Sequence, residues 1–312
     1  MALEHLSPRA VPKPWGSTDL RPWGGISRDG KAVGELWFER PSAAPESSLL
    51  LKLLYTTQPL SIQVHPSDEY ARSIGLAHGK TEAWYVLSAA PDARVGVGLK
   101  WSLTTSQYRR AIQDGSIADL VQWRRVQRDD VILVPAGTIH AIGAGLVIAE
   151  IQQRSDATFR IFDYGRKREL QIDNAVAAAE PGPATAHPVP HKLTDARSIL
   201  VADPHFVLER WDLPPNTRWD FNAEHETWIY AMRGSARIGS LDVATTGAVF
   251  AEDEHAIVEA GESGLRALAA YPSGEVCHRL LSKRDVSEHS FVPARPSPQS
   301  ARTRHRGTAT LQ

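Results

Sequence analysis

Most apolar runs in this chain are short, and glycine or proline separates one run from the next. Few segments repeat apolar residues at the three-to-four-residue period of a helix, so the pattern predicts an all-β fold with a few peripheral helices. Helices are expected at 104–114, where Thr and Ser can cap the start, and at 171–179. In the first half, strands are expected at 33–39, 49–55, 60–65, 82–88, 131–134 and 146–152.

A proline-rich segment divides the chain into two parts. Residues 181–202 begin with PGPATAHPVPHK, which has no apolar period, and are predicted to form a linker. Residues 1–180 are expected to form the catalytic domain, and residues 203–292 a second, smaller β-domain. Residues 293–312 contain almost no large apolar side chains, which is typical of a disordered tail. In the second part, strands are expected at 206–211, 227–232, 235–241, 248–251, 256–259 and 265–271.

Composition narrows the classes of function. The 312 residues include 42% hydrophobic and 23% charged residues, as in a soluble globular protein. A formal net charge of -1 gives no electrostatic reason to expect a nucleic acid or a membrane as partner. No apolar run approaches the roughly 20 residues of a membrane span, and the start of the chain lacks the apolar core of a signal peptide. We therefore expect a cytoplasmic protein.

The single cysteine directs attention to other metal ligands. Because Cys277 is alone, an intramolecular disulfide and thiolate metal sites are both excluded. The 12 histidines and the carboxylates remain as candidate ligands.

One predicted strand carries polar side chains at alternate positions. Residues two apart on a strand point to the same face, so Ser61, Gln63 and His65 share one face of the segment 60–66 (LSIQVHP). In a half-buried strand this face would meet water, whereas inside a β-barrel it can line a cavity. By itself, His65 is more typical of a surface or satisfied core histidine than of a metal ligand.

Two further segments supply a carboxylate and a second imidazole. Lys80 and Glu82 share a face at the start of a strongly apolar strand, and a Pro-Gly turn (PAGTIH) brings His140 to the start of another. The spacing of the three segments fits successive strands of one barrel. Two imidazoles, one carboxylate and one amide oxygen suit zinc, or iron, manganese or cobalt. We therefore expect one divalent metal ion, bound by Gln63, His65, Glu82 and His140.

The order of these motifs is similar to that of type I mannose-6-phosphate isomerases, which are members of the cupin superfamily. The short two-cupin form typical of bacteria is the form that the chain resembles most. The resemblance covers about residues 12–180, with a weaker cupin-like similarity at 203–282. It is carried by QVHP (63–66), GKTEAWYV (79–86), VPAGTIHA (134–141) and EIQQRSDATFRIFDYGR (150–166), and by KPWG (13–16), GELW (34–37) and RELQID (168–173).

The resemblance implies two cupin barrels, that is, double-stranded β-helices or jelly rolls, with small helical additions. The first barrel would hold the ion, zinc in the family, through the four residues named above. The second barrel is expected to be metal-free, because the spacing of His225, Glu226 and His255 does not repeat the first constellation. A structural or interface role is the better interpretation of these three residues.

The resemblance also implies an activity, the interconversion of mannose 6-phosphate and fructose 6-phosphate through an enediolate. Arg160 stands where the family has an active-site arginine, and Lys80 matches a lysine that lines the sugar site. Arg166 stands where many members carry a basic residue suited to the substrate phosphate. A surface salt bridge with Asp163 is the alternative for Arg166.

Other parts of the expected site are less defined. Ser61 and Glu150 are further expected substrate contacts. Three groups are candidates for the catalytic base: a metal-bound water, Glu150, and Lys80 if burial lowers its pKa. One departure from the family is Ile142, where some members have an aromatic residue.

Two other functions fit a metal-binding cupin. One is an oxygen-using dioxygenase with iron at the same site, against which the basic residues argue. The other is a non-catalytic sugar-phosphate-binding protein, against which the intact ligand set and Arg160 argue. A phosphorylated hexose is the expected partner, and the protein is expected to be a monomer or homodimer.

Overall fold

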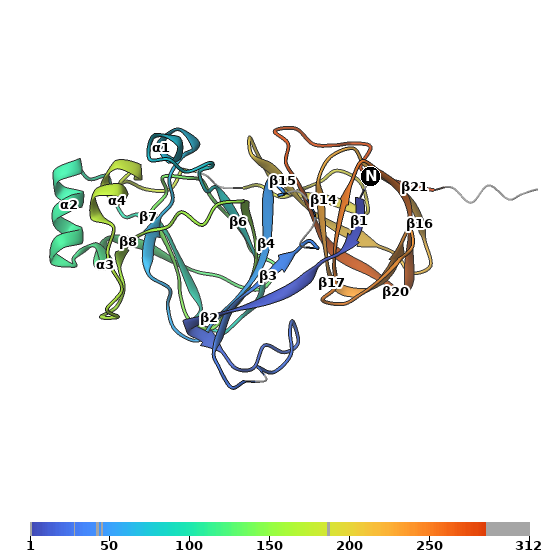
Figure 1. The fold of residues 1–312 in the computed structure, drawn as a ribbon, viewed down its shortest axis with the longest axis horizontal. Coiled ribbons are helices and arrows are strands. Elements are labelled where there is room, and N and C mark those ends of the chain that lie inside the picture. The colour runs from blue at the N-terminus through green and yellow to red at the C-terminus, as the bar shows by residue number, and fades with distance from the viewer. Residues whose placement is uncertain (1, 28, 42–43, 45, 186–187, 285–312) are drawn as a thin grey trace, which may run out of the picture.

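The computed structural model is mostly β-strand, with four short helices in the part of the chain that it describes (Figure 1). This arrangement confirms the predicted all-β fold with a few peripheral helices. None of the described helices is long and apolar enough to cross a membrane. The described residues are 2–27, 29–41, 44, 46–185 and 188–284.

The N-terminal half consists of two sheets that face each other rather than one closed barrel. The six-stranded sheet has the order β2 (Ser7–Ser17), β3 (Val33–Glu39), β4 (Leu49–Thr56), β11 (Leu146–Gln153), β6 (Glu82–Ala89) and β9 (Val131–Val134). The five-stranded sheet has the order β12 (Phe159–Phe162), β5 (Ile62–Val64), β10 (His140–Ile142), β7 (Arg94–Leu99) and β8 (Val121–Arg125).

Strand periodicity gives each sheet two different faces. In β4, Leu51, Leu53 and Tyr55 pack toward the C-terminal half, and Lys52 and Leu54 alternate with them toward the interior. The interior between the two sheets is apolar at one end and polar at the other. The polar end is the cavity described below.

Helices cover the outer face of the five-stranded sheet at one end of the molecule (Figure 1). Tyr108 and Ile112 pack there against Ile62 and Val64 of β5. The helix at residues 105–114 begins with a capping box at Thr104, in agreement with the cap that the sequence indicated. The helices are α2 (Thr105–Asp114), α3 (Ile117–Leu120) and α4 (Ile172–Ala178), while α1 (Asp68–Ser73) follows β5.

The C-terminal half is one ten-stranded sheet that folds around its own core. The strands are long because glycine permits the backbone to bend within them, as at Gly234 (φ 79°), where a Cβ would meet the carbonyl oxygen of Gly264. Its order is β1 (Ala2–His5), β19 (Ala248–Glu252), β17 (Thr227–Ile238), β20 (Glu254–Tyr271), β15 (Phe206–Leu213), β14 (Arg197–Asp203) and β13 (His191–Lys192), with β16 (Arg218–Ala223), β18 (Leu241–Ala244) and β21 (Leu281–Lys283) at the sides.

The structure differs from the sequence-based division at two points. Residues 2–5 lie in the C-terminal sheet, where β1 pairs with β19, and not in the N-terminal half (Figure 1). The predicted linker 181–202 contains β13 and most of β14, because Arg197 is buried and paired with Glu209. The predicted tail 293–312 and the last residues of the predicted second domain lie outside the described residues.

A shared apolar layer joins the two halves. Tyr55 and Phe38 from the N-terminal half pack in one cluster with Trp228 and Tyr230 from the C-terminal half. Glu226 adds a polar contact, since its carboxylate accepts the backbone N–H groups of Ser48 and Leu49 at 2.6 and 2.8 Å. The interface role expected for Glu226 matches this contact.

Candidate metal centre and active site

Three buried side chains from different strands meet at the polar end of the N-terminal half. His65 follows β5, Glu82 opens β6 and His140 opens β10. The Nε2 atoms of both histidines lie 3.3 Å from the Glu82 carboxylate oxygens, one histidine at each oxygen. One potential ligand atom from each residue lies within 4.8 Å of the others. The three side chains therefore enclose a space that one cation can occupy.

Backbone carbonyl groups fix the tautomer of both imidazoles. Nδ1 of His65 donates to the carbonyl of Ala157 at 2.8 Å, and Nδ1 of His140 donates to that of Thr138 at 2.9 Å. The Nε2 lone pairs therefore face the Glu82 carboxylate, which is the orientation that metal-binding histidines adopt.

Burial keeps both imidazoles neutral. It lowers the pKa of His65 to about 3 and the pKa of His140 below its ordinary value. Burial opposes ionisation of Glu82, but the charge of Lys80 outweighs it and holds the pKa of Glu82 well below its usual range. Two imidazole lone pairs and one carboxylate converge here, and these are donors that a divalent metal ion prefers, so the donor set fits such an ion.

The amide of Gln63 completes the predicted ligand set. Gln63 pairs with His140 across β5 and β10, and its Nε2 lies 3.2 Å from His140 Nε2. Rotating the amide by half a turn would present Oε1, the atom that binds cations. Ser61 donates to Gln63 Oε1 at 3.1 Å from the same strand face, as expected. The structure thus brings the four predicted ligands together.

Lys80 lies against the centre as a cation. Its Nζ is 3.0 Å from His65 Nε2 and 2.5 Å from Glu82 Oε2. Burial lowers the pKa of Lys80, but Glu82 and Glu150 outweigh this and raise it above its ordinary value. Lys80 was a candidate base on the condition that its pKa is lowered, and the structure does not meet that condition.

A cavity of about 240 Å³ opens beside these residues. Its apolar wall includes Trp15, Leu60 and Ile142. The rest of the wall is strongly charged. The charged residues that line it are Lys13, Glu35, Lys52, Lys80, Glu82, Glu150, Asp156, Arg160 and Arg168.

Glu150 is the carboxyl group in this cavity whose pKa is suited to proton transfer. Burial, followed by the nearby charge of Glu82, raises the pKa of Glu150 to about 7. Trp84 Nε1 donates to its Oε2 at 3.1 Å, and Lys52 Nζ lies 3.8 Å from its Oε1. Glu150 can therefore both accept and release a proton near neutral pH.

The predicted arginines do not all reach the cavity. Arg160 lines it, and its buried Nε has no hydrogen-bond partner among the described residues. Arg166 is not among the lining residues, because it is held by Asp163 at 3.0 Å and by the carbonyl of Pro59 at 2.8 Å. Arg166 therefore forms the ion pair with Asp163 that the sequence offered as the alternative to a phosphate contact. Arg168, which sequence reasoning missed, lines the cavity and also pairs with Asp163.

Three further residues of the cavity were also missed. Lys13 forms an ion pair with Glu35 at 3.2 Å, and the indole N–H of Trp37 donates to Glu35 at 2.6 Å. Lys52 lies over the Trp37 ring, with Nζ 4.3 Å from the ring centroid. A signal for Lys52 was present, since it is one lysine within the otherwise apolar strand 49–55.

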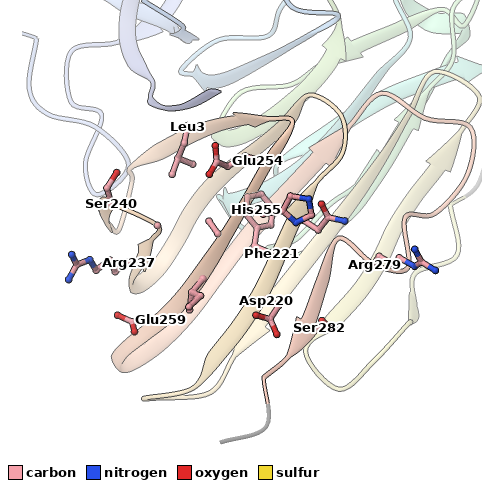
Figure 2. A pocket seen from close by; sticks show the side chains of 14 residues that line it. Leu3, Asp220, Phe221, Arg237, Ser240, Glu254, His255, Glu259, Arg279 and Ser282 are labelled. Carbon is pink, nitrogen blue, oxygen red and sulfur yellow. The ribbon is translucent and has the colours of Figure 1, made fainter. Parts of the chain in front are cut away.

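A larger open groove of about 820 Å³ lies on the C-terminal half (Figure 2). His255, Asp220 and Glu259 line it, and arginines pair with two of them, Arg218 with Glu259 at 2.7 Å and Arg284 with Asp220 at 3.4 Å. Within the described ranges, the His65 group is the one set of three or more histidines or carboxylates close enough to share a metal ion.

Comparisons with known proteins agree with this arrangement. No protein-family model matches the chain. The chain is 35% identical over 175 residues to mannose-6-phosphate isomerase ManA of Bacillus subtilis, covering 53% of this chain and 55% of that protein. It is 34% identical over 198 residues to mannose-6-phosphate isomerase of Streptococcus mutans, covering 61% of this chain and 62% of that protein.

The likeness in structure extends further than the likeness in sequence. The crystal structure of mannose 6-phosphate isomerase from Bacillus subtilis superposes with a TM-score of 0.75 at 22% identity, covering 87% of this chain and 100% of that chain. The chain matches little more than half of the length of the curated relatives. The resemblance to mannose-6-phosphate isomerases and the cupin-type fold are therefore confirmed.

Proposed function

We propose that the protein is a metal-dependent aldose–ketose isomerase that interconverts mannose 6-phosphate and fructose 6-phosphate. The observation that carries this proposal is one small cavity that combines a His-Glu-His centre, a carboxyl group with a pKa near 7, and arginine side chains. The names of the similar proteins support it. The lysine and arginine side chains on the cavity wall support the proposed substrate, because a sugar phosphate is an anion.

Gln63, His65, Glu82 and His140 are the residues that we propose hold the ion, and zinc suits their nitrogen and oxygen donors. A divalent ion there would supply Lewis acidity toward the carbonyl and hydroxyl oxygens of the sugar. The carbonyl groups of Ala157 and Thr138 support this role, since they hold the proton of each ring on Nδ1 and leave a lone pair on each Nε2.

Glu150 is the proposed base that moves the proton between the two adjacent carbons. In its ionised form it would remove the proton from one carbon and, once protonated, deliver it to the other. Trp84 and Lys52 orient and stabilise the carboxylate. Lys80 and Arg160 are proposed to stabilise the negative charge of the enediolate, because both are cations on the cavity wall.

The phosphate contact is proposed for Arg168, together with Arg160, instead of Arg166. A guanidinium group can contact two phosphate oxygens at once. Both arginines donate to Asp163, but Arg168 lines the cavity, whereas Arg166 does not and donates also to the carbonyl of Pro59.

The competing functions explain the cavity less well. An oxygen-using cupin needs an apolar substrate pocket, and this wall carries charged side chains around most of its extent. A sugar-phosphate sensor would have no use for Glu150 with a pKa near 7. We propose a cytoplasmic monomer or homodimer that acts on no nucleic acid, in keeping with the single free Cys277 and the near-zero net charge.

A coupled assay tests the proposed function. Zinc-loaded protein should convert mannose 6-phosphate to fructose 6-phosphate, and Arg160→Ala should retain its metal content while its rate falls by about 100-fold or more. Arg125→Ala is the matched control, because Arg125 is exposed and pairs only with Asp92 among its described neighbours. Absence of turnover by metal-loaded wild-type protein would refute the proposal. An unchanged rate for Arg160→Ala would refute the role of that residue.

A further inference from the structure

The segment 79–81, which carries Lys80 into the centre, belongs to no helix or strand. Hydrogen bonds hold it instead. The Gly79 N–H donates to Asp68 Oδ1 at 2.7 Å, and the Lys80 N–H donates to the carbonyl of Pro66 at 3.0 Å. At the far end, the Thr81 N–H donates to Gln153 Oε1 at 2.9 Å. Both ends of the segment are therefore tied to other parts of the fold.

Asp68 and Gln153 also hold each other. Nε2 of Gln153 donates to the same Asp68 oxygen, Oδ1, at 3.1 Å, and the Gln153 N–H donates to the carbonyl of Thr81 at 3.1 Å. The Asp68 carboxylate thus binds the first residue of the segment, Gly79, and the Gln153 side-chain amide binds the last, Thr81. We call this pair the Asp68–Gln153 clamp.

The clamp lies where the segment after His65 and the segment before Glu82 are in close contact. A Cβ on Gly79 would lie 2.6 Å from the Pro66 carbonyl oxygen and 2.6 Å from the Asp68 nitrogen, so only glycine allows this approach. Pro66 directly follows His65, and Thr81 directly precedes Glu82. The clamp therefore connects the backbone next to His65 with the backbone next to Glu82, and Lys80 lies in the connected segment.

We propose that Asp68 and Gln153 are positioning residues for the metal centre, and that the clamp sets both its affinity for the ion and the alignment of Lys80. The part about alignment for catalysis rests on the proposed function. The part about metal affinity does not. Hydrogen bonds one step removed from metal ligands affect affinity because they remove the freedom of the ligands to turn away.

The C-terminal half touches the clamp through a different atom. His205, in the turn between β14 and β15, has Nδ1 at 3.8 Å from Asp68 Oδ2. The clamp uses only Oδ1 of Asp68. The His205 contact and the clamp can therefore be removed separately.

A set of substitutions separates the two contacts. Asp68→Ala removes the clamp and the His205 contact, Asp68→Asn retains an Oδ1 acceptor but removes the charge, and His205→Ala removes only the His205 contact. Glu69→Ala is the matched control, because Glu69 is an exposed acidic residue in the same first turn of α1. Zinc affinity is measured by chelator competition, alongside kcat, KM and the melting temperature.

We expect Asp68→Ala to weaken zinc binding by about 10- to 100-fold and to lower kcat by a similar factor with little change in KM. Asp68→Asn, His205→Ala and Glu69→Ala should stay within about threefold of wild type in zinc affinity. Wild-type affinity in Asp68→Ala would overturn the proposal. Equal losses in Asp68→Asn and Asp68→Ala would also overturn it, because the charge and not the clamp would then carry the effect.

Gln153→Leu provides a second route to the same result. It removes the side-chain contacts to Thr81 and Asp68 and leaves α1 intact, so it should reproduce the loss of zinc affinity even if Asp68→Ala does not fold. A folded Gln153→Leu protein with wild-type zinc affinity would refute the clamp. Wild-type protein that binds zinc but does not isomerise the sugar would refute the proposed function and leave the affinity test valid.

Discussion

Glu150 is expected to lower the stability of the protein in exchange for reactivity. It is buried, at 3% exposure, and its pKa is raised to about 7 from an ordinary 4.5 by burial and then by Glu82. A carboxyl group with a raised pKa favours the folded state below about pH 4.5, and this advantage is lost as the pH rises through 7. At pH 8 the buried carboxylate should therefore destabilise the fold by about 3 kcal/mol relative to a neutral group, at about 1.4 kcal/mol per pH unit.

Glu150→Gln replaces this group with a neutral one of nearly the same shape. Its amide oxygen can still accept the hydrogen bond from Trp84. In urea unfolding of metal-free protein, followed by tryptophan fluorescence, we expect Glu150→Gln to be more stable than wild type by about 3 kcal/mol at pH 8 and by about 1 kcal/mol or less at pH 5. The same variant should lose about 100- to 10,000-fold in kcat, because it cannot accept a proton.

The dependence on pH is the decisive part of this test. Glu69→Gln, an exposed carboxylate at the surface of α1, serves as control and should show no such difference between the two pH values. A Glu150→Gln protein that is less stable than wild type at pH 8, or equally stabilised at pH 8 and pH 5, would refute the reasoning. Retained turnover would refute the assignment of Glu150 as the base.

Three further predictions follow from other contacts. His140→Ala should lose its metal by elemental analysis and its activity, and a variant that keeps both would contradict the ligand assignment. Arg168→Ala should raise KM by about 10- to 100-fold with a smaller change in kcat. Arg166→Ala should leave KM within about twofold of wild type, and equal effects of the two substitutions would contradict the phosphate assignment. Glu209→Ala should lower the free energy of unfolding by about 3–5 kcal/mol, because it leaves the fully buried Arg197 without its ion pair, and a loss below about 1 kcal/mol in urea unfolding would contradict this.

The alternation of polar and apolar residues was sufficient to predict much of the fold. The strand 33–39 was predicted with its observed bounds, as was 131–134, since both are short β-branched or aromatic runs between turn residues. The ligand set was also accessible, because Gln63 and His65 alternate on one strand. The order of motifs then identified which other histidine and carboxylate lie near them.

Long-range contacts could not be predicted in the same way. Arg166 and Arg168 lie two positions apart in an irregular segment, and both pair with Asp163. Only the folded structure shows that Arg168 lines the cavity while Arg166 donates to the carbonyl of Pro59. Residues 197–202 of the strand β14 were assigned to a linker because they follow a proline-rich stretch, and the pairing of Arg197 with Glu209 becomes visible only in the folded sheet. The Asp68–Gln153 clamp similarly joins residues far apart in the sequence.

The pairing of β1 with β19 has a consequence for synthesis on the ribosome. Ala2 is made long before its partner Glu252, because the residues of the N-terminal half are made between them. Until then, this first strand presents unpaired N–H and C=O groups, and the apolar face around Tyr55 has no cover from Trp228. A nascent or prematurely terminated chain therefore exposes a strand edge and an apolar surface together, a combination that favours aggregation and recognition by chaperones.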